Sequence, residues 1–256
     1  MNVLVCVKRV PATGGRIGLT ADAQEIDTRF LGFTVSPHEE CAVEEAVRLV
    51  ETFGGASTVL TLGPAAAEEQ LRDAMAVGVD SAILLETDGS DWDPQGTASA
   101  IVDAVRAQEA AGTSFDLLLF GNEAADTGDF QVPVRVADAL GLPCVTGIKA
   151  LQVAEGQALA RREVGGGWEE YVAPLPAVVA VREGINLPRY PSVPGRLRAR
   201  RREILRLAPI PRAATLVKRR LVLPPQKGSE VEVLGTGIDA VPRVLDVLER
   251  LGLVPA

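Results

Sequence analysis

Short, predominantly apolar runs alternate with longer segments of helical periodicity through the first 140 residues. This alternation limits the possible folds more than any other feature. We expect strands at residues 2–7, 58–62, 81–85 and 116–120. A run without polar alternation is typical of a strand buried on both faces. The order therefore predicts the α/β class, with a doubly wound, mostly parallel, Rossmann-like sheet.

Helices are expected beside these strands, at residues 37–53, 65–77, 94–111 and 129–140. The first has the clearest beginning, because Ser36 is a favourable N-cap and Pro37 suits the first helical position. Gly54 ends that helix, and Gly141 followed by Pro143 ends the fourth.

The pattern changes after residue 147. Short apolar stretches then follow one another closely at residues 150–153, 158–163, 169–172 and 177–181, after a further strand that begins near Cys144. Glycines supply the turns, so we expect an antiparallel addition at the edge of the sheet. Beyond residue 187 the chain is rich in Pro and Arg, with a last helix at residues 241–251. The sequence thus predicts a nucleotide-binding domain at residues 1–187 and an extended C-terminal arm at residues 188–256.

The charge is unevenly distributed along the chain. The formal net charge is −8, yet residues 196–220 hold ten Lys or Arg and a single acid, Glu203. A basic stretch is one signature of nucleic-acid binding. This stretch contains no aromatic side chain, and the acidic remainder of the chain would repel phosphates. We therefore expect no nucleic-acid partner and interpret the stretch as a solvated arm or a protein-docking segment.

Few side chains suit catalysis or metal binding. His38 is the one histidine, and Cys6, Cys41 and Cys144 lie far apart in sequence. Neither a nucleophile paired with a histidine nor a zinc site with close ligand spacing is predicted. Three scattered cysteines are typical of a reducing compartment. The apolar start of the chain is too short for a signal peptide, so we expect a cytoplasmic protein.

A ligand site is expected where the strands end, because open doubly wound sheets bind ligands at the carboxyl ends of their strands. After the strand at residues 116–120, a Gly- and Asp-rich loop leads into a helix whose free N–H groups suit a phosphate. The segment comprises Gly121, Asn122, Glu123, Ala124, Ala125, Asp126, Thr127, Gly128, Asp129, Phe130, Gln131 and Val132. Its polar residues are also ordinary helix caps, so the residues alone leave a nucleotide loop and a capped helix equally open.

Longer motifs recur in a fixed order from residue 2 to about residue 202. They are VLVCVKRV from Val3, SPHEECAVEEAVRL from Ser36, LGP from Leu62, LRDAMAVGVD from Leu71, REVGGGWE from Arg162, LPAVV from Leu175 and NLPRYPSVP from Asn186. Gly121, Asp126 and Gln131 add a loop of matching spacing. Together these motifs resemble the beta (small) subunit of electron transfer flavoproteins.

The resemblance implies a heterodimer with a flavin-bearing alpha subunit that holds most of the contacts to FAD. It implies a fold of the adenine-nucleotide-binding type, in which the beta subunit binds an AMP and lends a surface to that FAD. It further implies a carrier, not an enzyme, that takes electrons from soluble flavin dehydrogenases and passes them towards a quinone reductase. By position, the AMP pocket comprises the loop residues 121–132 with Cys6, Ser36, Pro37, His38, Glu39 and Leu62.

Other positions of the family correspond less directly to residues of this chain. Cys6 and Leu62 suit a plain core role equally well, and Thr13 and Glu163 match positions near the flavin. The family offers one apolar anchor to its dehydrogenase, and Val193 matches that anchor. It lies in what we call the docking segment, which comprises Tyr190, Pro191, Ser192, Val193 and Pro194. The basic residues that follow would steer an acidic partner.

The loop also departs from the family's common AMP pattern, because Phe130 and Val132 replace an Asn and a Thr on either side of Gln131. A related group that splits electron pairs holds a second FAD in the same pocket, with a Gln at the offset of Gln131. The sequence therefore does not decide whether this pocket binds AMP or a second FAD. A lone nucleotide-binding signalling domain is a third interpretation, and the long basic arm argues against it.

Overall fold

The computed structural model describes residues 1–12, 14, 17–225 and 232–254. Internal contacts divide the chain into two units, Met1–Arg220 and Leu221–Ala256. The strands of the first unit are β1 (Asn2–Cys6), β2 (Val10–Pro11), β3 (Phe33–Thr34), β4 (Ala56–Gly63), β5 (Ser81–Glu86), β6 (Leu117–Gly121), β7 (Cys144–Ala154), β8 (Gln157–Val164), β9 (Gly167–Pro174), β10 (Ala177–Val181) and β11 (Leu205–Leu207). Its helices are α1 (Pro37–Phe53), the 3-10 turn η1 (Ala65–Ala67), α2 (Glu68–Val77), α3 (Pro94–Ala110), α4 (Val132–Leu140) and α5 (Val193–Arg201).

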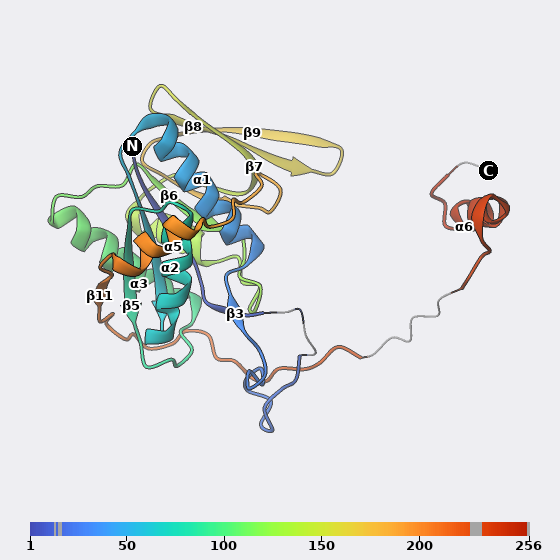
Figure 1. Ribbon diagram of the computed structural model, residues 1–256, viewed down its shortest axis with the longest axis horizontal. Coiled ribbons are helices and arrows are strands. Elements are labelled where there is room, and N and C mark those ends of the chain that lie inside the picture. The colour runs from blue at the N-terminus through green and yellow to red at the C-terminus, as the bar shows by residue number, and fades with distance from the viewer. Residues whose placement is uncertain (13, 15–16, 226–231, 255–256) are drawn as a thin grey trace. The chain divides into compact units, whose positions relative to one another are not determined.

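Within the described residues, one large sheet has the strand order β11-β5-β4-β1-β6-β10-β7-β8-β9 (Figure 1). Strand β1 pairs in parallel with β4 and β6, and the parallel pairing continues to β11 on one side and to β7 on the other. Strands β7, β8 and β9 are antiparallel and form one edge. The predicted fold class, a mostly parallel sheet with an antiparallel addition, is confirmed.

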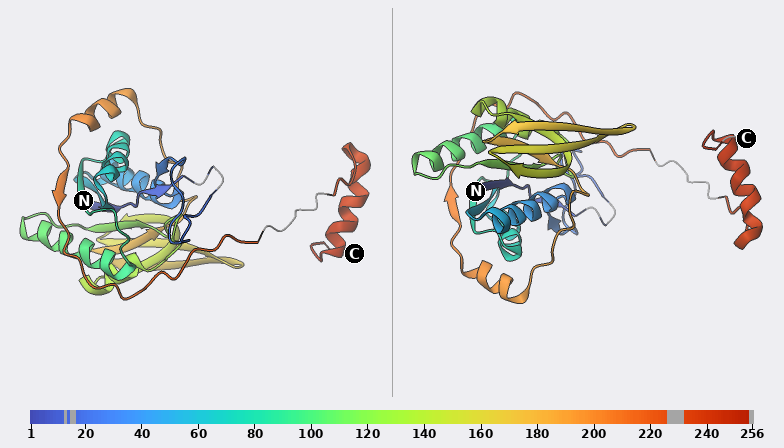
Figure 2. Two further views of the ribbon diagram at one scale, coloured as in Figure 1. Left: turned by 90° about the horizontal axis from the view of Figure 1, so that it is seen from below. Right: turned by 90° about the horizontal axis from the view of Figure 1, so that it is seen from above.

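Helices cover both faces of the sheet (Figure 2). Val3 and Val5 of β1 pack into one core with Leu71 of α2, whereas Leu4 packs into a second core with Ile101 of α3. Alternate residues of a strand point to opposite faces, so a strand covered on both faces is apolar throughout. This is the physical reason for the uninterrupted apolar runs.

Strand β10 corrects one expectation. Residues 177–181 were expected in the antiparallel addition, but β10 lies inside the sheet and pairs in parallel with both β6 and β7. All five of its residues are buried. The short connection from β9 favoured an antiparallel neighbour, yet the uninterrupted apolar run is the pattern of a strand covered on both faces.

Some element boundaries also differ from the expected ones. Helix α4 begins at Val132 instead of residue 129, with Pro133 in its first turn. The stretches expected at residues 144–146 and 150–153 form the single strand β7, whose register shifts between Ile148 and Ala150. Positive φ at Gly147 adjoins this irregularity and suits a residue without a side chain.

Residues 188–220 belong to the first unit by their contacts. Helix α5 packs against α2, and β11 pairs in parallel with β5 at the sheet edge. The predicted division into a domain at residues 1–187 and a C-terminal arm at residues 188–256 stays a prediction. The second unit contains the 3-10 turn η2 (Gly237–Ala240) and α6 (Val241–Arg250), which confirms the last predicted helix. Among the helices described, none has the length and apolar character that crossing a membrane requires.

Candidate functional site

The candidate site lies where β1 and β6 end. From β1 the chain passes through α1 to β4 on one side, whereas β6 lies on the other side of β1. The strand order thus reverses between β1 and β6, and open α/β sheets bind ligands in the crevice at such a reversal. The loop at residues 121–131 contacts the start of α1 through Glu123, and α4 begins directly after this loop.

Glu39 connects the start of α1 to the chain that leaves β1. Its carboxylate accepts hydrogen bonds from the backbone N–H groups of Ser36 at 3.0 Å and Lys8 at 2.9 Å. The side chain is buried, and burial raises the pKa of Glu39 to about 7 although both donors act in the opposite direction. Both carboxylate oxygens of this predicted site residue therefore have partners within the chain.

The loop after β6 packs against the first turn of α1. The Ser36 hydroxyl donates to the carbonyl oxygen of Glu123 at 3.3 Å, and the Asn122 N–H donates to Val181 in β10 at 2.8 Å. A Cβ built on Gly121 would lie only 2.6 Å from Cγ of Glu39. Glycine at position 121 therefore permits this close approach of loop and helix.

Two carboxylates of the loop have basic or imidazole partners. Lys8 Nζ lies 2.7 Å from Asp126 Oδ2. His38 accepts a hydrogen bond from the Glu183 N–H at Nδ1, at 2.7 Å, so Nε2 carries the ring proton. That Nε2 lies 3.2 Å from Glu123 Oε1. These contacts lessen the repulsion that the acidic loop would exert on an anionic ligand.

Helix α4 begins without a side-chain cap among the described residues. Gln131 occupies the N-cap position, but its side-chain oxygen accepts from Arg135 at 2.9 and 3.2 Å instead of from the first turn. Arg135 also donates to Gln95 in the first turn of α3. Backbone N–H groups at an uncapped helix start suit a phosphate, which also interacts favourably with the helix dipole.

The remaining residues predicted at the pocket have varied surroundings. Cys6 is buried in the same core as Leu60, and burial raises the pKa of its thiol. Leu62 is half-buried against that core at the end of β4, and Phe130 is exposed. Thr13, predicted near the flavin, lies outside the described residues. Glu163 on β8 pairs with Lys149 at 2.5 Å.

The docking segment leads into α5. Tyr190 is 95% exposed and Val193 is 73% exposed. Val193 is the first residue of α5 instead of a loop residue, because the hydroxyl of Ser192 accepts from the N–H of Gly195 at 3.1 Å and caps the helix. The predicted anchor therefore stands at a helix start, where its backbone is fixed.

Three basic residues make specific contacts in or beside these segments, and sequence reasoning placed only Lys8, at the end of the first strand, among the candidate site elements. Lys8 and Arg135 contact the loop, and Arg189 precedes the docking segment and pairs with two glutamates of α1. Arg135 and Gln131 lie one helical turn apart, whereas the pairs of Lys8 and Arg189 join segments that only the folded chain brings together. A single sequence contains no signal for such a pairing, apart from the position of Arg189 inside the NLPRYPSVP motif.

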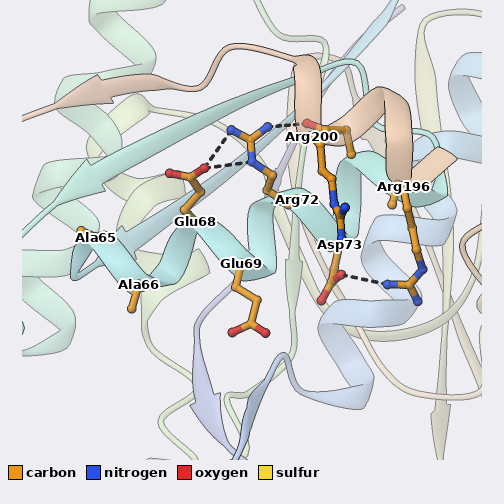
Figure 3. Close-up of a pocket in the computed structure, with 10 residues that line it drawn as sticks. Ala65, Ala66, Glu68, Glu69, Arg72, Asp73, Arg196 and Arg200 are labelled. Carbon is orange, nitrogen blue, oxygen red and sulfur yellow. Dashed lines mark hydrogen bonds and ion pairs between the residues drawn. The ribbon is translucent and has the colours of Figure 1, made fainter. Parts of the chain in front are cut away.

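Two cavities adjoin these elements. A groove of about 460 Å³ lies between α2 and α5 and has charged walls that include Glu68, Arg72, Asp73 and Arg196 (Figure 3). A smaller cavity of about 80 Å³ lies beside Ala125 and Asp126 and is otherwise lined by apolar side chains and Pro11. The larger groove contains none of the residues predicted to bind a nucleotide.

Comparisons with known proteins agree with the motifs. A family model described as "Electron transfer flavoprotein domain" matches residues 26–211. The chain is 36% identical over 207 residues to an "Electron transfer flavoprotein subunit beta" of Bacillus subtilis, covering 80% of this chain and 77% of that protein. It is 34% identical over 234 residues to a protein of the same name from Syntrophomonas wolfei, covering 91% and 90%. A third, from Mycobacterium leprae, is 36% identical over 209 residues, covering 79% and 77%. The chain therefore belongs to the electron transfer flavoprotein family, and more specifically to its beta subunits.

Proposed function

We propose that this chain is the beta subunit of a heterodimeric electron transfer flavoprotein that acts in the cytoplasm. In this proposal it binds a structural AMP and helps to enclose the FAD of the alpha subunit. It also docks soluble flavin dehydrogenases and passes their electrons on towards a quinone reductase. The chain is a carrier subunit without catalytic residues, and the bound FAD supplies the redox chemistry.

One observation supports the nucleotide site above all others. The uncapped start of α4 and the loop at residues 121–131 lie at the strand-order reversal, beside the first turn of α1. In the proposed complex, N–H groups of α4 and of the loop hold the phosphate. Arg135 holds the Gln131 side chain away from those donors, and the Lys8–Asp126 pair reduces the negative charge nearby.

A second FAD in place of AMP is the alternative. The missing Asn and Thr of the common AMP loop favour it, whereas Gln131 is shared by both loop patterns. The chain would then belong to a complex that oxidises NADH at this subunit. Both proposals use the same site and differ in the nucleotide bound there, which is either AMP or a second FAD.

Nucleotide content tests the proposal. The chain is co-expressed with its alpha subunit, the purified complex is denatured, and the released AMP and FAD are quantified per heterodimer. One FAD with one AMP is the expected result. Two FAD without AMP would establish the alternative, and one FAD without a second nucleotide would refute the site.

Two variants of one α4 residue test whether the second nucleotide binds at the start of this helix. Val134 is an exposed residue in the first turn of α4, so Val134→Asp places a negative charge beside the free N–H groups without disturbing the core. We expect this variant to lose most of its second nucleotide because the charge repels the phosphate. Val134→Asn is the neutral control of similar size and should retain it.

A further inference from the structure

Residues 183–191, which lead into the docking segment, lie outside the helices and strands. Among the residues that the structure describes, this stretch forms no backbone–backbone hydrogen bond and belongs to no helix or strand. Such a stretch would ordinarily sample many conformations. What holds it is a series of contacts with side chains and carbonyls of α1.

Three of these contacts follow one another along α1. The N–H of Glu183 donates to His38 near the start of the helix. One turn further, the Asn186 side chain donates to the Cys41 carbonyl and to the Glu45 carboxylate, both at 2.9 Å. Arg189 makes the last contact, immediately before Tyr190.

Arg189 makes the most extensive of these contacts. Its guanidinium donates to Glu44 at 2.9 and 3.0 Å and to Glu51 at 2.6 and 2.9 Å, and its backbone N–H donates to Glu44 at 3.1 Å. The Glu44 side chain is 5% exposed, whereas that of Glu51 is 56% exposed. A planar guanidinium that bridges two carboxylates fixes both the position and the orientation of the backbone that carries it.

The other end of the docking segment is fixed on α2. A Cβ built on Gly195 would lie 2.2 Å from the carbonyl oxygen of Ala76, so α5 approaches the backbone of α2 as closely as glycine allows. Ser192 caps the same turn. Tyr190 and Val193 therefore lie exposed between two fixed points, Arg189 on α1 and Gly195 on α2.

We propose that Arg189 is a positioning residue for dehydrogenase docking: by bridging Glu44 and Glu51 it holds the exposed Tyr190 and Val193 in the arrangement that a partner binds. This inference rests on the proposed docking function. A partner that meets a preformed apolar pair does not have to order the segment, and the saved entropy strengthens the encounter. Arg189 acts through this ordering and does not need to touch the partner.

The test uses the heterodimer and the variant Arg189→Met, which keeps a long apolar stem and removes the bridge. Arg48→Met is the matched control, because Arg48 pairs with the same Glu44 at 3.4 Å but lies on α1 itself. Arg189→Lys and Glu51→Gln are milder variants, and circular dichroism verifies that each heterodimer is folded. The readouts are amide hydrogen exchange at position 189, whose N–H donates to Glu44, and electron transfer from a soluble flavin dehydrogenase of the source organism, reduced by its own substrate.

We expect Arg189→Met to speed exchange of the amide at position 189 by about tenfold or more, because loss of the guanidinium bridge frees the backbone there and weakens the hydrogen bond from this N–H to Glu44. The KM for the heterodimer should rise about tenfold with kcat unchanged. Glu51→Gln and Arg189→Lys should have smaller effects in the same direction, and Arg48→Met should have none.

Val193→Asp separates the two possible failures. Unchanged exchange in Arg189→Met overturns the positioning role. Faster exchange with an unchanged KM, while Val193→Asp abolishes transfer, also overturns it, because docking then needs no preordered segment. If Val193→Asp transfers electrons normally, the docking function of this surface fails, and the inference fails with it.

Discussion

At the scale of single residues, Gly121 and Glu39 determine how closely the nucleotide loop approaches α1. Glu39 ties the first turn of α1 to Lys8, two residues after β1, and Gly121 leaves room for it. The two residues lie far apart in sequence and meet at the carboxyl edge of the sheet. Their contact sets the backbone geometry of the proposed phosphate site.

Gly121→Ala should therefore destabilise the protein. The new methyl group would meet Cγ of Glu39 at 2.6 Å and its backbone N at 3.1 Å, so the loop must move away from α1. We expect a loss of about 1–3 kcal/mol in the free energy of unfolding, measured with urea. Gly165→Ala is the control, because no heavy atom lies within 4 Å of a Cβ there. Equal stability of the two variants would contradict the contact.

Glu39 should make stability depend on pH. Its pKa in the folded chain is about 7 against an ordinary value of 4.5, so the folded state binds the proton more tightly than the unfolded state. The free energy of unfolding should be highest below the ordinary pKa and should fall as pH rises through this interval, by at most about 3 kcal/mol.

Glu39→Gln provides the comparison because glutamine does not titrate. Urea unfolding of both proteins at several pH values in this interval should give a steeper decline for the natural chain than for the variant. Parallel curves would mean that the carboxyl group titrates alike in the folded and unfolded states.

At the scale of elements, Asp93 joins the start of α3 to the segment after β11. One oxygen accepts from Gly96 at 2.7 Å, and the other accepts from Thr215 N–H, Thr215 Oγ and Leu216 N–H at 2.7, 2.9 and 3.1 Å. Desolvation alone would raise the pKa of Asp93, but these donors hold it at about 2. One side chain thus caps a helix and anchors residues 215–216.

Asp93→Ala should release that segment. We expect trypsin to cleave after Arg212 and Lys218 several-fold faster in this variant, because proteolysis requires local freedom of the backbone. Asp103→Ala removes only the exposed pair between Arg212 and Asp103, so it should have little effect. Similar cleavage rates for both variants would refute the role of Asp93 as an anchor.

At the scale of the whole molecule, four of the ten basic residues at positions 196–220 pair with acids of the described chain, namely Arg196, Arg206, Arg212 and Lys218. Arg206 pairs with Glu68 and Glu86, and Lys218 pairs with Glu25 and Asp91. The uneven charge seen in the sequence therefore serves, in part, to hold residues 196–220 against the rest of the first unit. Exposed arginines of α5 remain available to steer an acidic partner.

The isolated chain should bind no flavin firmly. Cofactor pockets enclose most of the ligand surface, whereas the proposed site is bounded, in this chain, by one edge of one sheet. After expression without the alpha subunit, we expect the purified protein to lack visible flavin absorbance. A stoichiometric flavin spectrum that survives dialysis against buffer would contradict this expectation.

The sequence by itself determined the fold class, most element positions and the family. Runs such as residues 117–120 in β6 and the capped start of α1 at Ser36 and Pro37 are local patterns, and local patterns can be read from one chain. The predicted site residues that meet at the carboxyl edge followed from topology, because parallel strands end at the same edge.

Only the tertiary structure decided which residues pair across the fold. It placed β10 between β6 and β7, set Val193 at the start of α5, and joined Arg189 to Glu44 and Glu51. Partners such as Arg189 and Glu51 are separated by more than a hundred residues, and their pairing depends on how α1 lies on the sheet. That packing depends on the whole chain, so neither residue predicts the pairing by itself.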